Sequence, residues 1–285
     1  MKQNVFKKSV AILIMALILI VALLVGFMLT QKADAEMVIW EKIDYLAISE
    51  KYEYTGMTMY AFDYSGSRFS KYKNLYIFIN GAGGMGGASD ENNVGYGGGS
   101  GGMAVAKVDK NNTIGLIVCI GQGGGSFEFD SPNYQYGDGY DTGVIAIKYA
   151  ASWPIDIDGV MCKGGKAGSS IAPGKGGNTI AVSDYPKPYC ELIYSQDGAS
   201  GGEASNAFTV DLGFRKQYFI FRPAGTNLSG KGGGASVFHR GGDGGVVFQN
   251  GFNGSKGSGG GGASKGATQG GYGGDGYVEI YGSNM

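Results

Sequence analysis

Short apolar runs with the length of a β-strand recur along the chain, and most of them border a stretch rich in glycine. These runs occupy residues 57–62, 75–79, 103–108, 113–120, 143–149, 216–221 and 276–281. Strands in globular proteins are most often ~5–6 residues long. After residue 35, no stretch of about ten or more residues repeats its apolar positions with the ~3.6-residue period of a helix. The pattern therefore predicts an all-β fold of short antiparallel strands joined by irregular segments.

Glycine supplies 56 of the 285 residues and gathers in blocks, such as residues 81–87, 97–102, 230–234 and 257–262. The usual share is ~7%. Because glycine has no side chain to bury and loses more backbone freedom on folding than any other residue, such blocks are either ordered through their own N–H and C=O groups or flexible. Aromatic residues make up 12% of the chain, whereas flexible linkers and disordered segments contain few of them. We therefore expect a folded protein in which main-chain groups hold the glycine blocks.

The N-terminus has the pattern of a targeting segment. Three lysines precede an unbroken apolar run at residues 11–29, and residues 33–35 form an A-x-A motif for cleavage. The run is also long enough to span a bilayer. Residues 1–35 are thus either a signal peptide cleaved after Ala35 or a membrane anchor that is retained. Both readings predict that residue 36 onward is secreted or lies at the cell surface, with membrane contact only through residues 11–29 in the uncleaved form.

Glycine content divides the rest of the chain. Residues 36–73 form an N-terminal β segment, residues 74–182 a first glycine-rich lobe, and residues 229–285 a second glycine-rich lobe with a closing strand. Residues 183–228 contain little glycine and show short strand-like runs between the two lobes. A segment of ~45 residues rarely folds alone. We therefore interpret it as an insertion rather than a separate domain.

The composition argues against nucleic-acid binding and against catalysis. The chain has 23 Lys and Arg against 24 Asp and Glu, whereas binding to nucleic acid requires positive charge opposite the phosphates. The G-x-S-x-G patterns around Ser100, Ser200 and Ser264 lack the strand-to-helix turn and the histidine base of a hydrolase, since the one histidine is His239. Residues 81–86 match a dinucleotide motif, but no helix follows them. We assign no catalytic residue and no cofactor; only a carboxylate-based glycosidase stays open, because its two acids need not be near in sequence.

Neither the candidate metal ligands nor the cysteines match the spacing of a known kind of site. Cysteine and histidine are not clustered as in a zinc site. Four aspartates stand near one another in the sequence, namely Asp138, Asp141, Asp156 and Asp158. Because they lack the spacing of a calcium loop, we expect them to cap turns rather than bind a metal. Cys119 lies in an apolar run and is interpreted as a small buried residue. Three cysteines predict no disulfide framework, and pairing of Cys162 with Cys190 is left open.

Four stretches, taken in order, resemble elements of a known family. They are residues 76–84, 96–102, 117–124 and 273–281. A strand running into Gly-Ala-Gly-Gly, a Gly-Gly-Gly-Ser-Gly-Gly block, a Val-Cys-Ile-Gly-Gln-Gly-Gly element and a closing strand are similar to the extracellular glycine-rich domain of phage tail-tip adhesins, bacterial surface proteins and the anaplastic lymphoma kinase ectodomain. The resemblance implies that the glycine stretches form a packed bundle of left-handed, polyproline-II-like helices bordered by strands. It implies nothing about residues 36–73 and 183–228.

The expected function follows from a rigid scaffold that displays loops, because binding residues concentrate on such loops. The loop at residues 127–140 carries aromatic side chains among polar ones, and tyrosine is favoured at interfaces. The predicted ligand-binding residues are Phe129, Tyr134, Tyr136 and Tyr140. The same rings can instead cap the edge of the scaffold. We expect a non-catalytic, adhesin-like module that binds a cell-surface protein or carbohydrate; the alternative is a self-associating coat or matrix component that forms homo-oligomers.

Overall fold

The computed structural model describes residues 41–43, 50–54, 57–64, 68–125, 137–148, 156–182, 189–213 and 215–284. The chain divides into two units, one of residues 1–39 with 284–285 and one of residues 40–283, and nearly all the described residues belong to the second unit. The apolar run at 11–29 and the cleavage motif lie outside the described residues. Among the residues that are described, no helix has both the length and the apolar character needed to cross a membrane.

The described residues form short strands with only two single-turn 3-10 helices, η1 (Arg68–Lys71) and η2 (Lys110–Asn112). The strands are β1 (Glu41–Ile43), β2 (Glu50–Tyr54), β3 (Met57–Asp63), β4 (Asn74–Asn80), β5 (Met103–Asp109), β6 (Gly115–Gly121), β7 (Thr142–Lys148), β8 (Asp156–Cys162), β9 (Thr179–Val182), β10 (Cys190–Gln196), β11 (Phe208–Asp211), β12 (Lys216–Phe219) and β13 (Tyr277–Ser283). Every pairing between them is antiparallel. The prediction of an all-β fold with short antiparallel strands is confirmed.

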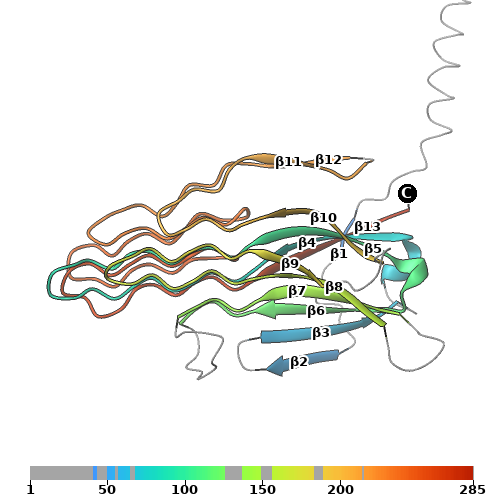
Figure 1. Cartoon of the computed structure of the whole chain (residues 1–285), viewed down its shortest axis with the longest axis horizontal. Coiled ribbons are helices and arrows are strands. Elements are labelled where there is room, and N and C mark those ends of the chain that lie inside the picture. The colour runs from blue at the N-terminus through green and yellow to red at the C-terminus, as the bar shows by residue number, and fades with distance from the viewer. Residues whose placement is uncertain are drawn as a thin grey trace, which may run out of the picture. The chain divides into compact units, whose positions relative to one another are not determined.

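The strands assemble into two larger sheets and one hairpin. One sheet has the order β1-β13-β4-β5-β10, the other has the order β2-β3-β6-β7-β8-β9, and β11 pairs with β12. Figure 1 shows the hairpin, the five-stranded sheet and the six-stranded sheet in succession. The five-stranded sheet includes strands from all the predicted parts of the chain after residue 35, because β10 comes from residues 183–228 and β13 from the C-terminus.

Strand β4 explains how the five-stranded sheet can be covered on both faces. Successive side chains of a strand point to opposite faces, and those from Leu75 to Asn80 are all buried. Leu75, Ile77 and Ile79 belong to an inner core shared with the six-stranded sheet. Tyr76 and Phe78 belong to an outer core shared with the β11–β12 hairpin. The apolar run at 75–79 is thus continuous because both of its faces are buried.

The inner core contains most of the large aliphatic side chains and two of the cysteines. In this core, the aliphatic side chains of the five-stranded sheet pack with those of the six-stranded sheet, namely Leu116, Val118, Val144 and Val160. Burying one such side chain contributes ~1.5–3 kcal/mol. The three cysteines, Cys119, Cys162 and Cys190, are buried and unpaired. The open question of a Cys162–Cys190 disulfide is therefore answered in favour of free thiols.

The glycine-rich segments continue from the strand ends and run side by side (Figure 1). Their bonding repeats every three residues. The N–H groups of Gly81, Gly84 and Gly87 donate to carbonyls of one antiparallel segment, those of Gly102, Gly99 and Tyr96, with N···O distances of 2.8, 2.8 and 2.7 Å. The intervening residues donate elsewhere: Ala82 and Met85 to residues 140 and 137, and Gly83 and Gly86 to residues 274 and 271. The segment therefore presents three bonding directions along its length.

The segment at 81–87 is enclosed by other glycine-rich segments. It donates to the segments at 96–102, 137–140 and 271–274. Its carbonyls accept from the N–H groups of Gly124, Gly165, Gly168, Gly260 and Ala263. The segments at 95–102 and 257–263 likewise donate in three directions and accept from three. Main-chain groups in the interior of this arrangement are thus satisfied by main chain from distant parts of the sequence, as buried polar groups require.

Close approach explains why two of every three residues at 81–87 are glycine. A Cβ on Gly84 or Gly86 would lie closer than 3.0 Å to a backbone carbonyl oxygen, that of Lys166 or Gly261. Real Cβ atoms essentially never approach so closely. Side chains occur only at the third position of each repeat, as Ala82 and Met85. The spacing of side chains in this block is the sequence counterpart of the three bonding directions.

Candidate functional site

The β11–β12 hairpin lies on the outer face of the five-stranded sheet and supplies one wall of the candidate site. Val210 and Phe219 of the hairpin are buried with Tyr76, Phe78 and Val105 of the sheet. Along β12 the side chains alternate, so Phe219 faces the sheet while Tyr218 is 68% exposed. The strand-like run predicted at 216–221 therefore contains β12, which pairs with β11 in a hairpin whose apolar side is buried only by packing on the five-stranded sheet.

Aromatic rings connect the hairpin to the sheet. Phe208 and Phe219 are directly opposite each other in the hairpin, and their rings stack with centroids 4.7 Å apart. Phe219 also contacts Phe78, at 5.7 Å, and Phe238, at 6.0 Å. The Phe238 ring meets that of Tyr277 edge to face at 5.0 Å. Such pairs each contribute ~0.5–1.5 kcal/mol beyond their buried area, which holds the hairpin in one position.

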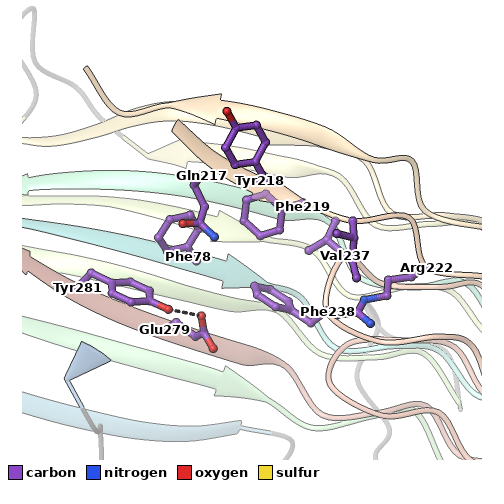
Figure 2. A pocket seen from close by; sticks show the side chains of 10 residues that line it. Phe78, Gln217, Tyr218, Phe219, Arg222, Val237, Phe238, Glu279 and Tyr281 are labelled. Atoms are coloured by element: carbon purple, nitrogen blue, oxygen red, sulfur yellow. Dashed lines mark hydrogen bonds between the residues drawn. The ribbon is translucent and has the colours of Figure 1, made fainter. Parts of the chain in front are cut away.

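A pocket of about 310 Å³ opens between the hairpin, the sheet and the turn that contains Phe238 (Figure 2). We call it the aromatic pocket. Its lining residues are Phe78, Gln217, Tyr218, Phe219, Ile220, Arg222, Val237, Phe238, Glu279 and Tyr281. Ligand pockets of proteins occupy ~300–1,000 Å³ and combine apolar walls with a few polar groups. The aromatic pocket is at the lower end of that range and has this composition.

Strand β13 presents the carboxylate of the aromatic pocket in a fixed orientation. Tyr277, Glu279 and Tyr281 alternate along the strand and therefore share its outer face, while Val278 and Ile280 between them are buried in the inner core. The Tyr277 hydroxyl donates to Oε1 of Glu279 at 2.7 Å, and the Tyr281 hydroxyl donates to Oε2 at 2.9 Å. Both carboxylate oxygens are thus held by phenols of the same strand.

Arg222 is the basic residue that lines the aromatic pocket, and Lys256 and His239 lie near it. The Nε of Arg222 is buried and has no hydrogen-bond partner among the described residues. The Nζ of Lys256 lies 4.2 Å from the ring centroid of Tyr277, a cation–π contact. Burial and the charges of Lys256 and Arg222 lower the pKa of His239, which favours its neutral form. In Figure 2, Arg222 lies beside Phe238 and Val237, and Glu279 lies with Tyr281 at the other side.

A second cavity, of about 470 Å³, borders the glycine-rich segments and is lined by Asp141, Lys163 and Lys166, which take part in two ion pairs. The Nζ atoms of Lys163 and Lys166 contact Oδ2 of Asp141 at 2.6 Å and of Asp138 at 2.8 Å. The other oxygens of these aspartates accept the backbone N–H of Gly164 and of Ala167. Elsewhere in the scaffold a backbone carbonyl accepts such an N–H group. Here a carboxylate oxygen of an aspartate takes the place of that carbonyl. The described residues contain no group of three or more His, Cys, Asp or Glu that could hold a metal ion.

The predicted ligand-binding loop is described only in part. Phe129, Tyr134 and Tyr136 lie outside the described residues. Tyr140 is half-buried; its N–H donates to the carbonyl of Gln122, and its carbonyl accepts from Ala82. Its backbone therefore belongs to the bonded scaffold, and the proposal that these rings form a ligand-binding face stays a prediction.

The aromatic pocket was missed at the level of sequence. Its residues come from four stretches that are far apart in the chain, around positions 78, 217–222, 237–238 and 279–281. One signal was available: alternation of Tyr, Glu and Tyr on β13 places polar and aromatic groups on one face of a strand whose other face is apolar. No protein-family model and no curated protein matches this chain. The function is therefore inferred from the geometry of the pocket and its scaffold.

Proposed function

We propose that the chain is an extracytoplasmic, non-catalytic binding module built on a bundle of glycine-rich, polyproline-II-like helices. A polyproline-II helix has three residues per turn and no internal hydrogen bonds. The three-residue repeat of the partners of segment 81–87, and the absence of any bond within that segment, support this assignment. Neighbouring helices can approach closely because the residues between them lack a Cβ.

The same contacts support a rigid scaffold. Ordering a residue's backbone costs ~1–2 kcal/mol, and a hydrogen bond contributes a net ~0.5–1.5 kcal/mol. The glycine bundle alone is therefore close to balance. The inner core, which joins the two large sheets, supplies the additional free energy through buried residues such as Ile77, Val118 and Ile280. Loops and surface pockets that need not contribute to stability are then available for binding.

The single observation that carries the proposal is the aromatic pocket. Its walls are aromatic and aliphatic, and its polar groups are few and oriented, which is the composition of a recognition site. Its one carboxylate, that of Glu279, accepts two phenol hydroxyls and belongs to no acid pair in the described lining. The partner class that suits such a site is a cell-surface protein or carbohydrate. The loop with Phe129, Tyr134, Tyr136 and Tyr140 is proposed as a second contact surface.

A cell-retention assay tests the function. Beads coated with the full-length chain are incubated with a panel of cell types, untreated or treated with protease or with periodate, which cleaves sugar diols. We expect at least one cell type to retain the beads and Tyr218→Ser to lower retention about tenfold or more, because exposed aromatic anchors dominate interface energies. Phe252→Ser is the matched control, since it removes an exposed ring outside the pocket.

Two results would contradict the module. One is that no cell type retains the beads. The other is that retention is indifferent both to Tyr218→Ser and to joint replacement of Tyr134, Tyr136 and Tyr140 by serine. Concentration-dependent fibres of the purified chain, in place of a dispersed species, would instead support the self-associating coat component, since exposed strand edges allow sheets to associate.

A further inference from the structure

Arg222 is the group in the aromatic pocket whose bonding the fold leaves incomplete. Its Nε is buried with no acceptor, and its guanidinium forms no ion pair among the described residues. The main chain of Arg222 is nevertheless held in place, because its carbonyl accepts the N–H of Ser205 at 3.0 Å in an isolated antiparallel bridge. A buried donor without a partner is unfavourable, more so on a charged group. Such a group requires an explanation in a native fold.

The charges around the aromatic pocket are unevenly satisfied. The carboxylate of Glu279 already accepts two tyrosine hydroxyls, whereas Arg222 and Lys256 have no acidic partner among the described residues. The unmet requirement at Arg222 is therefore for negative charge. A carboxylate fits it best, because a guanidinium binds a carboxylate through parallel N–H donors.

The rest of the pocket requires a ligand with both an apolar face and hydroxyl groups. The half-buried ring of Phe238 lies between Arg222 and Glu279 (Figure 2) and offers a surface to a ligand, whereas Phe78 and Phe219 line the pocket from the buried outer core. The face of an aromatic ring is negative, so it attracts the C–H groups that line one side of a pyranose ring. At the far side, the Glu279 carboxylate and the amide of Gln217 can accept or donate to hydroxyls. The pocket volume of about 310 Å³ suits a ligand about the size of a sugar ring.

We infer that the aromatic pocket binds a saccharide that carries a carboxylate, with the carboxylate on Arg222, the sugar ring on Phe238 and hydroxyls toward Glu279. The inference rests on the proposed binding function and gives its ligand class. Arg222 is the residue that selects acidic over neutral sugar, and the Phe238 ring binds both.

Ligand-observed NMR with two matched probes tests the inference. The full-length chain, in a detergent without a sugar headgroup, is titrated with methyl β-glucuronide and with methyl β-glucoside, which differ in a carboxylate against a hydroxymethyl group. We expect the glucuronide to bind about tenfold or more tightly, as a charge-assisted bond provides, and added salt to reduce this preference. Arg222→Gln removes the preference while the glucoside binds as before, which shows that the variant is folded.

Two further variants refine the test. Arg222→Lys keeps the charge but not the planar fork, so it retains part of the preference. Arg240→Gln is the matched control, because Arg240 pairs with Asp243 and does not line the pocket; it leaves the preference unchanged.

Three results would overturn the inference: equal binding of the two glycosides, a preference that survives Arg222→Gln, or binding of neither. The proposed function fails separately. If neither glycoside binds while Tyr218→Ser still lowers cell retention, the ligand class is wrong and the binding module stands. If retention is also indifferent to Tyr218 and the tyrosine loop, both are wrong.

Discussion

Replacing Gly86 by alanine tests the idea that main chain packed on main chain orders the glycine-rich segments. The N–H of Gly86 donates to the carbonyl of Gly271 at 2.8 Å, and its Cα faces the carbonyl of Gly261 so closely that a Cβ cannot fit. Both neighbours are backbone and cannot rotate away. To restore an ordinary van der Waals distance, the segments at 81–87 and 257–263 must separate by about 1 Å or more.

The magnitude follows from the bonds that this separation stretches. Two bonds of 3.0 Å, from Gly260 to Gly84 and from Ala263 to Gly87, join the two displaced segments, and the Gly86–Gly271 bond joins the segment at 81–87 to the one at 271–274. Leaving a buried group unsatisfied costs ~1–3 kcal/mol. We therefore expect Gly86→Ala to lower the free energy of unfolding by ~3–6 kcal/mol, a large part of the ~5–15 kcal/mol of a typical domain.

Gly202→Ala is the matched control. Gly202 has a φ of +82° and open space around its Cα, so alanine there is disfavoured only by the left-handed conformation, by ~1–2 kcal/mol. Urea unfolding followed by tyrosine fluorescence measures both changes. Amide hydrogen exchange then locates them: in the wild type the N–H groups of 81–87 should be protected, and Gly86→Ala should deprotect them. A smaller loss for Gly86→Ala than for Gly202→Ala, or wild-type amides that exchange like an unfolded chain, would refute the reasoning.

Two further predictions concern the acceptors and the thiols. Asp141→Asn keeps an oxygen for the N–H of Gly164 but loses the ion pair with Lys163, which is partly exposed. We expect it to lower the free energy of unfolding by less than ~1 kcal/mol, against ~1–3 kcal/mol for Asp141→Ala. Equal losses for the two variants in urea unfolding would argue against the acceptor role. Burial raises the pKa of the Cys162 and Cys190 thiols to about 12, so native protein should resist iodoacetamide at pH 8 while unfolded protein reacts. The unfolded thiols ionise at lower pH than the native ones, so their contribution to stability is present below pH ~9 and is lost as the pH rises toward 12. Fast alkylation of the native protein would contradict this. So would a free energy of unfolding that, in comparison with a Cys-to-Ala variant, does not change across that pH range.

The strands that the sequence revealed are those whose side chains are apolar without interruption or alternate cleanly. Strand β4 was predicted because both of its faces are buried, and β13 because its alternation is regular. Strand β8 was missed because Asp156, Asp158 and Gly159 interrupt its apolar pattern. Asp158 is buried; its Oδ2 accepts the N–H of Cys190 across the fold, while its Oδ1 has no partner among the described residues. The partner of Oδ2 lies 32 residues away in the sequence, so no local pattern indicates that this side chain can be buried.

The glycine-rich segments, too, were predictable from the sequence only in part. The block at 81–87 carries its repeat in the sequence, since side chains stand at every third position, as Ala82 and Met85. This spacing is sufficient to indicate three bonding directions, because only glycine permits the close approach. It does not indicate which segments lie in those directions. One glycine N–H has the same chemistry as any other, so the partners at 96–102 and 271–274 cannot be recognised from composition.

By itself, the sequence determined the all-β class, the main strands and the requirement that the glycine blocks be held by backbone, because these depend on local periodicity and on the absence of side chains. Only the tertiary structure decided which segments neighbour one another, that three thiols stay apart, and that Phe78, Arg222 and Glu279 line one pocket. The physical reason is that the register of the paired strands fixes where each segment leaves the sheets, and therefore which segments become neighbours. Register arises from pairings between residues far apart in the chain, and the aromatic pocket is a consequence of those pairings.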